Sequence, residues 1–298
     1  MIKISGFSYI RNGFDYDVPF LESIQSILPI CDEFVIAVGD SSDGTREAIE
    51  ALNSPKLKII DTVWDNKLKK NGKIFAQQTN IALDNISGNW AFHLQADEVI
   101  HENDLPLLLE FIRENDDVHE VDGMLFPFIH FWGGYNYYRT SRRMHRFEIR
   151  AFKNNKCVRS YRDSQGFRIY SGKDTYEQGK EKGVKLKVKK IDIPVYHYNV
   201  RSPSSMVNKI QKMASCYNDG KIVNVENADT ILQKIDRLEM FQGRHPNVMQ
   251  QKVDSQDWQF TFDPTKPVWH KPKDRFMQPI EDFLGYRFGE YKNYRLIR

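Results

Sequence analysis

Two adjacent carboxylates follow a short apolar run about a third of the way along the chain. Residues 90–94 are mostly apolar, and Gln95-Ala96-Asp97-Glu98 comes directly after them. A run of this kind is typical of a strand that is buried on both faces. Acids at the end of such a strand are costly unless they bind something, and paired hard oxygens suit Mg²⁺ or Mn²⁺ carrying a phosphate. The alternative is a solvated strand end that opens a loop.

A second polar loop, Gly39-Asp40-Ser41-Ser42-Asp43-Gly44-Thr45, joins an expected strand to an expected helix. Asp43 and Gly44 fit a helix cap and a turn. Asp40 lies at the strand end, where a carboxylate accepts hydrogen bonds from a ribose hydroxyl or a base edge. The segment Gly6–Arg11 does not match the Gly-x-Gly-x-x-Gly of dinucleotide-binding proteins, and the chain has no Gly-Lys-Ser/Thr P-loop. The sequence therefore disfavours both of those chemistries.

The elements that position these loops alternate between strand and helix. Apolar patterning predicts strands over 2–10, 33–38, 57–63 and 90–94, and helices over 19–28, 45–52 and 74–86. Alternation of this kind predicts a parallel sheet with right-handed crossovers. In an open α/β sheet, ligands bind outside the carboxyl ends of the strands, so both polar loops are expected at one edge.

The pattern changes after Glu98. A helix is expected over 105–113, followed by strands over 123–131, 147–152 and 184–198 with little helix between them, which indicates an antiparallel or mixed portion. From Ser204 onward the pattern is helical, over 204–217, 229–241 and 277–290. We therefore expect an α/β domain over 1–203 and a helical C-terminal extension over 204–298.

Composition excludes several classes of protein. A net charge of +3 over 298 residues is too mild to argue for nucleic acid binding. Cys31, Cys157 and Cys216 are far apart, which argues for a reducing compartment and against a zinc site or a disulfide framework. Neither a signal peptide nor an apolar run of membrane-spanning length is visible, so a cytoplasmic location is expected.

Three segments together resemble glycosyltransferase family 2. Asp40–Thr45 looks like the Asp-x-Ser-x-Asp-Gly-Thr loop of that family in a shortened form, and 76–83 resembles the helix that precedes its metal motif. Gly88–Glu98 resembles its strand that ends in Asp-x-Asp, and order and spacing agree over residues 1–130. The resemblance implies a glycosyltransferase-A fold: α/β, with a mostly parallel central sheet flanked by helices, a mixed second half and a C-terminal helical extension. It also implies a nucleotide-sugar donor and a divalent metal.

The resemblance assigns metal ligands residue by residue. Asp97 matches the last acid of Asp-x-Asp, the usual direct ligand, and His197 matches a histidine that the C-terminal region of these enzymes often supplies. Gln95 replaces the first Asp of the motif. An amide still hydrogen-bonds a ribose hydroxyl, but the lost charge is expected to weaken metal affinity. Glu98 is expected to point away, because adjacent residues diverge.

Other positions are expected to contact the nucleotide by the same resemblance. Lys73, with Arg150 and Arg162, is suited to balance pyrophosphate charge, although surface salt bridges explain these residues as readily. The expected nucleotide-binding residues are Phe7, Arg11, Asp40, Lys73, Gln77, Gln95 and Ala96.

Sugar transfer with inversion needs a base for the acceptor hydroxyl. Asp163, in the polar turn 159–166, is the first candidate, and Glu148 is the second, with an ion-paired strand residue as its alternative reading. The aromatic stretch 126–138 begins as core. Its second half supplies Trp132 and Tyr135 as expected acceptor-pocket residues, since the C–H faces of a sugar stack on aromatic rings.

We interpret the chain as a metal-assisted glycosyltransferase that uses Mn²⁺ or Mg²⁺. It would move a sugar from a UDP- or GDP-linked donor to a hydroxyl of a carbohydrate or lipid-linked acceptor, in bacterial polysaccharide or lipopolysaccharide assembly. One alternative is a sugar nucleotidyltransferase, although Gly6–Gly13 is a poor match to its glycine-rich first loop. Another is a non-catalytic nucleotide-sugar-binding protein on the same scaffold, which Gln95 suggests.

The C-terminal segment 274–298 has apolar residues near helical spacing, followed by several basic residues. Such a helix either packs on the catalytic domain or a second subunit, as in a homodimer, or lies on the inner face of an anionic membrane. Glu281, Asp282 and Glu290 interrupt the basic face, so we favour packing. The apolar positions are Phe276, Ile280, Phe283, Leu284 and Phe288.

Overall fold

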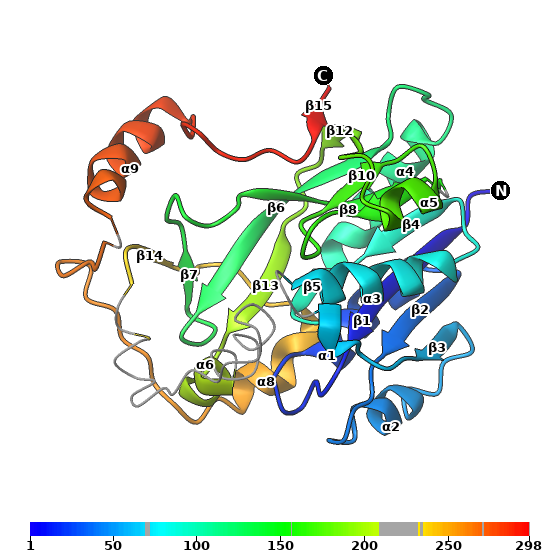
Figure 1. Ribbon diagram of the computed structural model, residues 1–298. Coiled ribbons are helices and arrows are strands. Elements are labelled where there is room, and N and C mark those ends of the chain that lie inside the picture. The colour runs from blue at the N-terminus through cyan, green and yellow to red at the C-terminus, as the bar shows by residue number, and fades with distance from the viewer. Residues whose placement is uncertain (69–71, 156, 209–231, 233–234, 270, 298) are drawn as a thin grey trace.

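The computed structural model describes residues 1–68, 72–155, 157–208, 232, 235–269 and 271–297. Its centre is a large sheet with the strand order β14-β7-β6-β8-β4-β1-β2-β3, which β5, β12, β13 and β15 join beside this path (Figure 1). A separate small sheet has the order β11-β10-β9. Within these residues, no helix has the length and apolar character needed to cross a bilayer.

The first half confirms the predicted parallel arrangement. Strands β1 (Ile4–Ile10), β2 (Glu33–Val38), β3 (Leu57–Asp61) and β4 (Trp90–His93) pair in parallel. The connecting helices are α1 (Phe20–Ile27), continued by η1 (Leu28–Ile30), then α2 (Thr45–Glu50), and α3 (Lys73–Asp84) after η2 (Asn66–Leu68). The carboxyl ends of all four strands therefore meet at one edge of the sheet.

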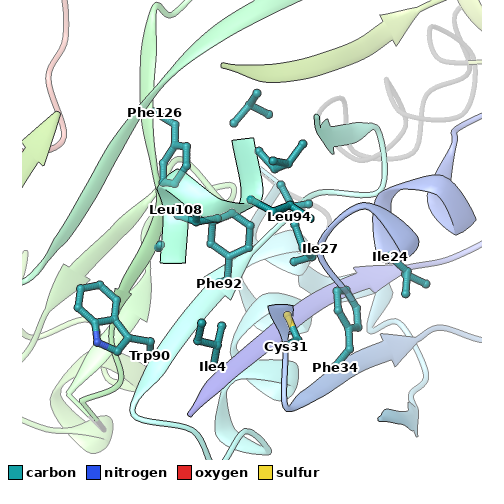
Figure 2. Packing of buried hydrophobic residues seen from close by; sticks show 14 of the residues in the cluster. Ile4, Ile24, Ile27, Cys31, Phe34, Trp90, Phe92, Leu94, Leu108 and Phe126 are labelled. Carbon is teal, nitrogen blue, oxygen red and sulfur yellow. The ribbon is translucent and has the colours of Figure 1, made fainter. Parts of the chain in front are cut away.

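Both faces of this parallel sheet are buried. Phe34 and Phe92 point to one face, where they pack with Ile24 and Ile27 of α1 and with Leu108 of α4 (Leu105–Asn115; Figure 2). The alternate residues of the same strands point to the other face and pack against α3. Because side chains alternate along a strand, burial of both faces requires the nearly continuous apolar runs seen in the sequence.

The second half is mixed, as expected. β8 (Phe147–Lys153) is antiparallel to both β4 and β6 (Gly123–Trp132). β12 (Lys187–Lys190) and β13 (Val195–Val200) run parallel to β6, while β5 (Glu98–Ile100) pairs antiparallel with β13. The single strand expected over 184–198 is thus divided. The shorter elements are β7 (Tyr137–Arg139), β9 (Val158–Ser160), β10 (Phe167–Ile169), β11 (Val184–Lys185), η4 (Glu102–Asp104) and α5 (Lys173–Glu177).

The C-terminal segment is less helical than expected. α6 (Pro203–Asn208) begins the first expected helix, whose remainder lies outside the described residues. The helix expected over 229–241 is wrong for Leu238–Met240, which form β14 and pair with β7. β15 (Arg295–Leu296) extends the sheet through β12. The remaining elements are η6 (Asn247–Met249), α8 (Gln250–Asp254) and α9 (Pro272–Leu284). A domain boundary after residue 203 stays a prediction.

Helix α9 differs from expectation in both its limits and its orientation. It begins at Pro272 and ends before Gly285, whose left-handed φ of 62° terminates it, rather than spanning 277–290. Its polar residues Asp274, Gln278 and Glu281 are buried. The apolar residues expected to pack are exposed instead: Phe276 71%, Ile280 48%, Phe283 89% and Leu284 52%.

Candidate active site

A cavity of about 210 Å³ opens at the carboxyl edge of the parallel sheet. Arg11 enters it from the end of β1, Trp64 from beyond β3, and Gln95-Ala96-Asp97 from the end of β4. The topology brings these segments together because parallel neighbours end on the same side. The lining residues are Tyr9, Ile10, Arg11, Tyr16, Val18, Trp64, Phe75, Gln95, Ala96, Asp97, His197 and Asn199.

One part of the cavity is aromatic. The rings of Tyr9 and Phe75 are stacked with centroids 6.1 Å apart, and Trp64 meets Phe75 edge-on at 5.7 Å. Gly39 leaves room for the indole, since a Cβ there would lie 2.6 Å from the Trp64 Nε1. Aromatic faces of this kind bind the face of a planar base.

A charged pair lies beside these rings. Arg11 Nη2 is 3.0 Å from Asp40 Oδ2, and the guanidinium lies over the Trp64 ring at 5.6 Å. Asp40 also accepts a hydrogen bond from the backbone N–H of Trp64 at 3.3 Å. Because the Asp40 side chain is 43% exposed, its oxygens remain accessible to donors from a ligand.

The rest of the loop after β2 serves to hold the loop after β1. Asp43 accepts hydrogen bonds from the backbone N–H of Asp15 and from the hydroxyl of Thr45, which itself accepts from Gly13 N–H. Burial alone would raise the pKa of Asp43, but these hydrogen bonds outweigh it and lower the pKa below its ordinary value. Asp43 therefore has a structural role in this loop, and the residue that caps α2 is Gly44.

Asp97 and His197 meet at another part of the cavity. Antiparallel pairing of β5 with β13 sets His197 opposite Glu98, and Tyr198 N–H donates to the carbonyl of Asp97 at 2.8 Å. The side chains then lie with His197 Nε2 3.2 Å from Asp97 Oδ2. Two residues a hundred positions apart are thus brought together by a single strand pair.

A chain of hydrogen bonds fixes which nitrogen of His197 carries hydrogen. The carbonyl of His145 can only accept, so His130 donates to it through Nε2 at 2.7 Å. Burial, and then the neighbouring His197 and His145, lower the pKa of His130 well below its ordinary value, so its ring is neutral. Its Nδ1 must therefore accept from His197 Nδ1, which lies 2.7 Å away.

This arrangement turns an acceptor nitrogen toward a carboxylate. With hydrogen on its Nδ1, His197 turns its Nε2 toward Asp97 Oδ2 at 3.2 Å, so either a proton or a cation lies between these two atoms. The pair therefore fits a divalent cation. In the described part of the chain, no group of three or more His, Cys, Asp or Glu side chains is placed to hold a metal, so phosphate oxygens and waters would complete the shell.

Glu98 points away from the cavity, as expected, and into the protein interior. It is buried and pairs with Arg150 through both oxygens, at 2.5 and 2.6 Å, and it also accepts the backbone N–H of Gln95 at 3.0 Å. Arg150 is therefore committed to Glu98 and is not placed to balance pyrophosphate. The buried pair instead positions the turn that presents Gln95 and Asp97.

The two candidate bases lie close to one another but do not line the cavity. Burial raises the pKa of Glu148 to about 7, although nearby Arg150 opposes the rise and the charges of Glu98 and Asp163 add to it. Its carboxylate approaches the turn that holds Asp163, since a Cβ on Gly166 would lie 2.9 Å from Glu148 Oε2. A pKa near neutrality suits a general base.

The other residues that were expected to contact the nucleotide or its pyrophosphate lie in different places. Phe7 is fully buried and packs edge-on against Phe167, so it does not face the cavity and that expectation needs correction. Lys73 is exposed at the first position of α3, and half-buried Gln77 lies one turn further on. Arg162 lies over Tyr161 and away from the cavity lining.

The expected acceptor residues lie in two different places. Trp132 packs with Val200 and donates its indole N–H to the carbonyl of Leu232. It lines neither the cavity that holds Asp97 nor the second cavity, which Tyr135 borders. Tyr135 is buried and borders a second cavity of about 360 Å³. There its hydroxyl accepts a hydrogen bond from Arg201 at 3.1 Å.

Sequence reasoning missed part of the cavity wall. Tyr9, Tyr16 and Asn199 belong to no motif, and Phe75 falls in the helix expected over 74–86 with nothing to mark it as a site residue. Trp64 had a usable signal, because it follows the carboxyl end of the third parallel strand. The rule that placed Asp40 and Asp97 at the ligand edge applies to it equally.

This sheet, with helices on both faces and a polar site where the parallel strands end, defines an α/β protein of glycosyltransferase-A type. The family model described as glycosyl transferase family 2 matches residues 18–172, just over half of the chain. The chain therefore belongs to glycosyltransferase family 2. The comparison with curated proteins finds no match.

Solved structures give weaker likenesses. The 1–349 portion of TarS from S. aureus is 15% identical over 78% of this chain and 70% of that one, with a TM-score of 0.39. The same protein with UDP-GlcNAc gives 20% identity over 44% of this chain and 35% of that one, with a TM-score of 0.31. Glucosyl-3-phosphoglycerate synthase from Mycobacterium tuberculosis was solved with Mn²⁺, UDP-glucose and glycerol 3-phosphate. It is 15% identical over 43% of this chain and 44% of that one, with a TM-score of 0.29.

The match spans only 22% of the longer TarS chain. At these TM-scores the likenesses carry no argument about what this chain binds. The family match and the topology carry the assignment.

Proposed function

We propose that this chain transfers a sugar from a nucleoside-diphosphate donor to a hydroxyl acceptor with the help of Mn²⁺ or Mg²⁺. The observation that carries the proposal is the composition of one cavity. Its aromatic wall and Arg11, with Asp40 paired to Arg11 beside the cavity, suit a base and ribose, while Asp97 and His197 suit a cation that carries phosphate. A nucleotide diphosphate has these two parts in one molecule.

Each residue has a defined role in this proposal. Tyr9, Trp64 and Phe75 hold the base, Asp40 accepts from ribose or base, and the Gln95 amide replaces a carboxylate near the ribose. Asp97 and His197 hold the cation. When bound, a divalent cation neutralises charge on a departing diphosphate.

A base for the acceptor hydroxyl completes the proposal. Asp163 remains the first candidate by its place in the turn 159–166, and Glu148 the second. The pKa of about 7 for Glu148 supports a role in proton transfer from one of this pair. Tyr135 and its cavity are proposed for the acceptor.

The biological setting is proposed on the resemblance alone. A carbohydrate or lipid-linked acceptor in bacterial polysaccharide or lipopolysaccharide assembly, on the cytoplasmic side of the membrane, suits an enzyme that consumes UDP- or GDP-sugars. The nucleotide and the sugar are the first properties to measure.

A panel of UDP- and GDP-sugars tests the function, with release of UDP or GDP measured in the presence of Mn²⁺ or Mg²⁺. We expect metal-dependent release from at least one donor that Asp97→Ala abolishes. Tight donor binding without release, even with sugar acceptors added, would favour the binding-protein alternative that Gln95 suggests. Pyrophosphate formation from a nucleoside triphosphate and a sugar phosphate would identify a nucleotidyltransferase instead.

A further inference from the structure

Helix α9 is attached to the protein by its polar face. Arg142 donates to Asp274 at 2.8 Å and to both oxygens of Glu281 at 3.0 Å, and the Arg142 backbone N–H donates to Gln278 at 2.6 Å. An amphipathic helix on a globular protein normally buries its apolar side. Here an arginine holds the acidic side inward, which leaves the apolar side facing outward.

The chain just after the helix adds two further exposed aromatic side chains. After Gly285 the chain places Tyr286 and Phe288 edge to face, with ring centroids 5.1 Å apart, and both side chains are exposed. Exposed apolar patches of this extent mark interaction sites. We call this surface the α9 patch; it consists of Phe276, Ile280, Phe283, Leu284, Tyr286 and Phe288.

The acidic residues near the α9 patch are all paired with arginines. Of the acids in this segment, Asp274 and Glu281 bind Arg142, Asp282 binds Arg237, and Glu290 binds Arg146. Two further arginines lie close by, since Arg143 is 3.9 Å from Asp274 and Arg287 is 3.9 Å from Glu290, so each acid has an arginine partner on the protein side.

The bases around the patch are not neutralised in this way. Within the described residues, no carboxylate pairs with the exposed Lys271, Lys273 or Arg275, and Lys292 lies over the Tyr286 ring at 5.6 Å. The acids that argued against a membrane from sequence alone therefore no longer offset the basic residues.

We propose that the α9 patch binds the surface of an anionic lipid bilayer. Outward phenylalanine and leucine side chains flanked by lysine and arginine match the apolar and charged layers of such a surface. Self-association through the same patch would bring the lysine and arginine side chains of two copies close together, and their repulsion opposes such a dimer. In Figure 1, α9 lies at the outer edge of the molecule near β7, far from β3, so a flat surface can reach it.

Vesicle cosedimentation tests the proposal on the full chain. We expect binding to vesicles of mixed phosphatidylcholine and phosphatidylglycerol, and little binding to phosphatidylcholine alone. Phe276→Ser combined with Phe283→Ser should lower the partition coefficient at least tenfold without lowering Tm, because both rings are already in solvent. Lys273→Gln combined with Arg275→Gln should lower it about 25-fold, at about fivefold for each basic residue.

Leu107→Ser is the matched control, since Leu107 is an exposed apolar residue on α4, outside the patch. It should leave vesicle binding unchanged. Failure of the full chain to bind anionic vesicles overturns the proposal, as does binding that the Phe276/Phe283 variant retains. A dimer that this variant dissociates, without vesicle binding, would assign the patch to a second copy. Because these variants lie outside the donor cavity, nucleotide-sugar turnover in solution tests the proposed function separately.

Discussion

Replacement of His130 by phenylalanine tests whether the histidine chain prepares His197 for a cation. Phenylalanine keeps an aromatic ring beside Phe128, against which His130 is stacked at 5.4 Å. It removes the Nδ1 that accepts from His197 and the Nε2–H that donates to His145. His197 is then free to carry hydrogen on either nitrogen, so its Nε2 no longer presents a fixed lone pair to Asp97.

The expected loss of Mn²⁺ affinity follows from what the hydrogen-bond partners of metal-binding histidines typically contribute. Removal of an outer-shell partner of a metal-binding histidine typically lowers metal affinity 10- to 100-fold, or about 1.4–2.7 kcal/mol. The carbonyl of His145 loses its donor, so the free energy of unfolding should also fall by about 1–3 kcal/mol. Titration of free Mn²⁺ by electron paramagnetic resonance, with UDP present, measures the first quantity, and urea unfolding measures the second.

His93→Phe provides the matched control. His93 is a buried histidine that packs against Phe7 and Phe167, and neither of its ring nitrogens has a hydrogen-bond partner among the described residues. Its replacement should leave Mn²⁺ affinity unchanged and stability equal or higher. A folded His130→Phe protein that binds Mn²⁺ within twofold of the wild type would refute the role assigned to the histidine chain.

Three further changes probe the same site. Asp97→Ala should abolish Mn²⁺-dependent donor binding, and metal-supported donor binding equal to that of wild type would contradict the ligand assignment. Asp40→Ala should raise the donor KM, since a charge-assisted hydrogen bond contributes about 1.5–3 kcal/mol, whereas an unchanged KM would reduce Asp40 to a loop residue. Glu148 has a folded pKa of about 7, above the ordinary 4.5, so the folded state binds its proton more tightly and stability falls as pH rises from 4.5 to 7. The free energy of unfolding of Glu148→Gln, relative to that of wild type, should therefore rise between pH 5 and pH 8, by at most about 3 kcal/mol in urea unfolding. If the difference between the two proteins is the same at pH 5 and at pH 8, the raised pKa of Glu148 is wrong.

Much of the parallel half could be predicted from local pattern. β2 occupies the predicted residues Glu33–Val38, and the alternation of strand and helix indicated a parallel sheet before any contact was known. The same rule placed Asp40 and Asp97 at a common edge. These features depend on residue spacing within one element and on general rules of connection, both of which a sequence contains.

The histidine chain was beyond the reach of that reasoning. His130 and His93 each occur in an apolar strand, so local pattern predicts the same structural role for both. Yet His130 lies opposite His197 in the pairing of β6 with β13, while His93 faces aromatic rings. The difference comes from strand order and register across the mixed half of the sheet. Register depends on the summed packing of whole strands, so no local spacing reveals which two histidines meet.

Helix α9 shows most clearly the difference between what local sequence pattern predicts and what tertiary structure decides. Its periodicity indicated an amphipathic helix, but periodicity only says that one side is apolar and not which side faces the protein. Arg142, more than a hundred residues earlier, decides the orientation, because it binds Asp274 and Glu281 where water is largely excluded. Local periodicity predicted that a helix forms here, although with other limits. The tertiary structure alone turned its apolar side outward, since buried ion pairs form only where the chain has already brought opposite charges together.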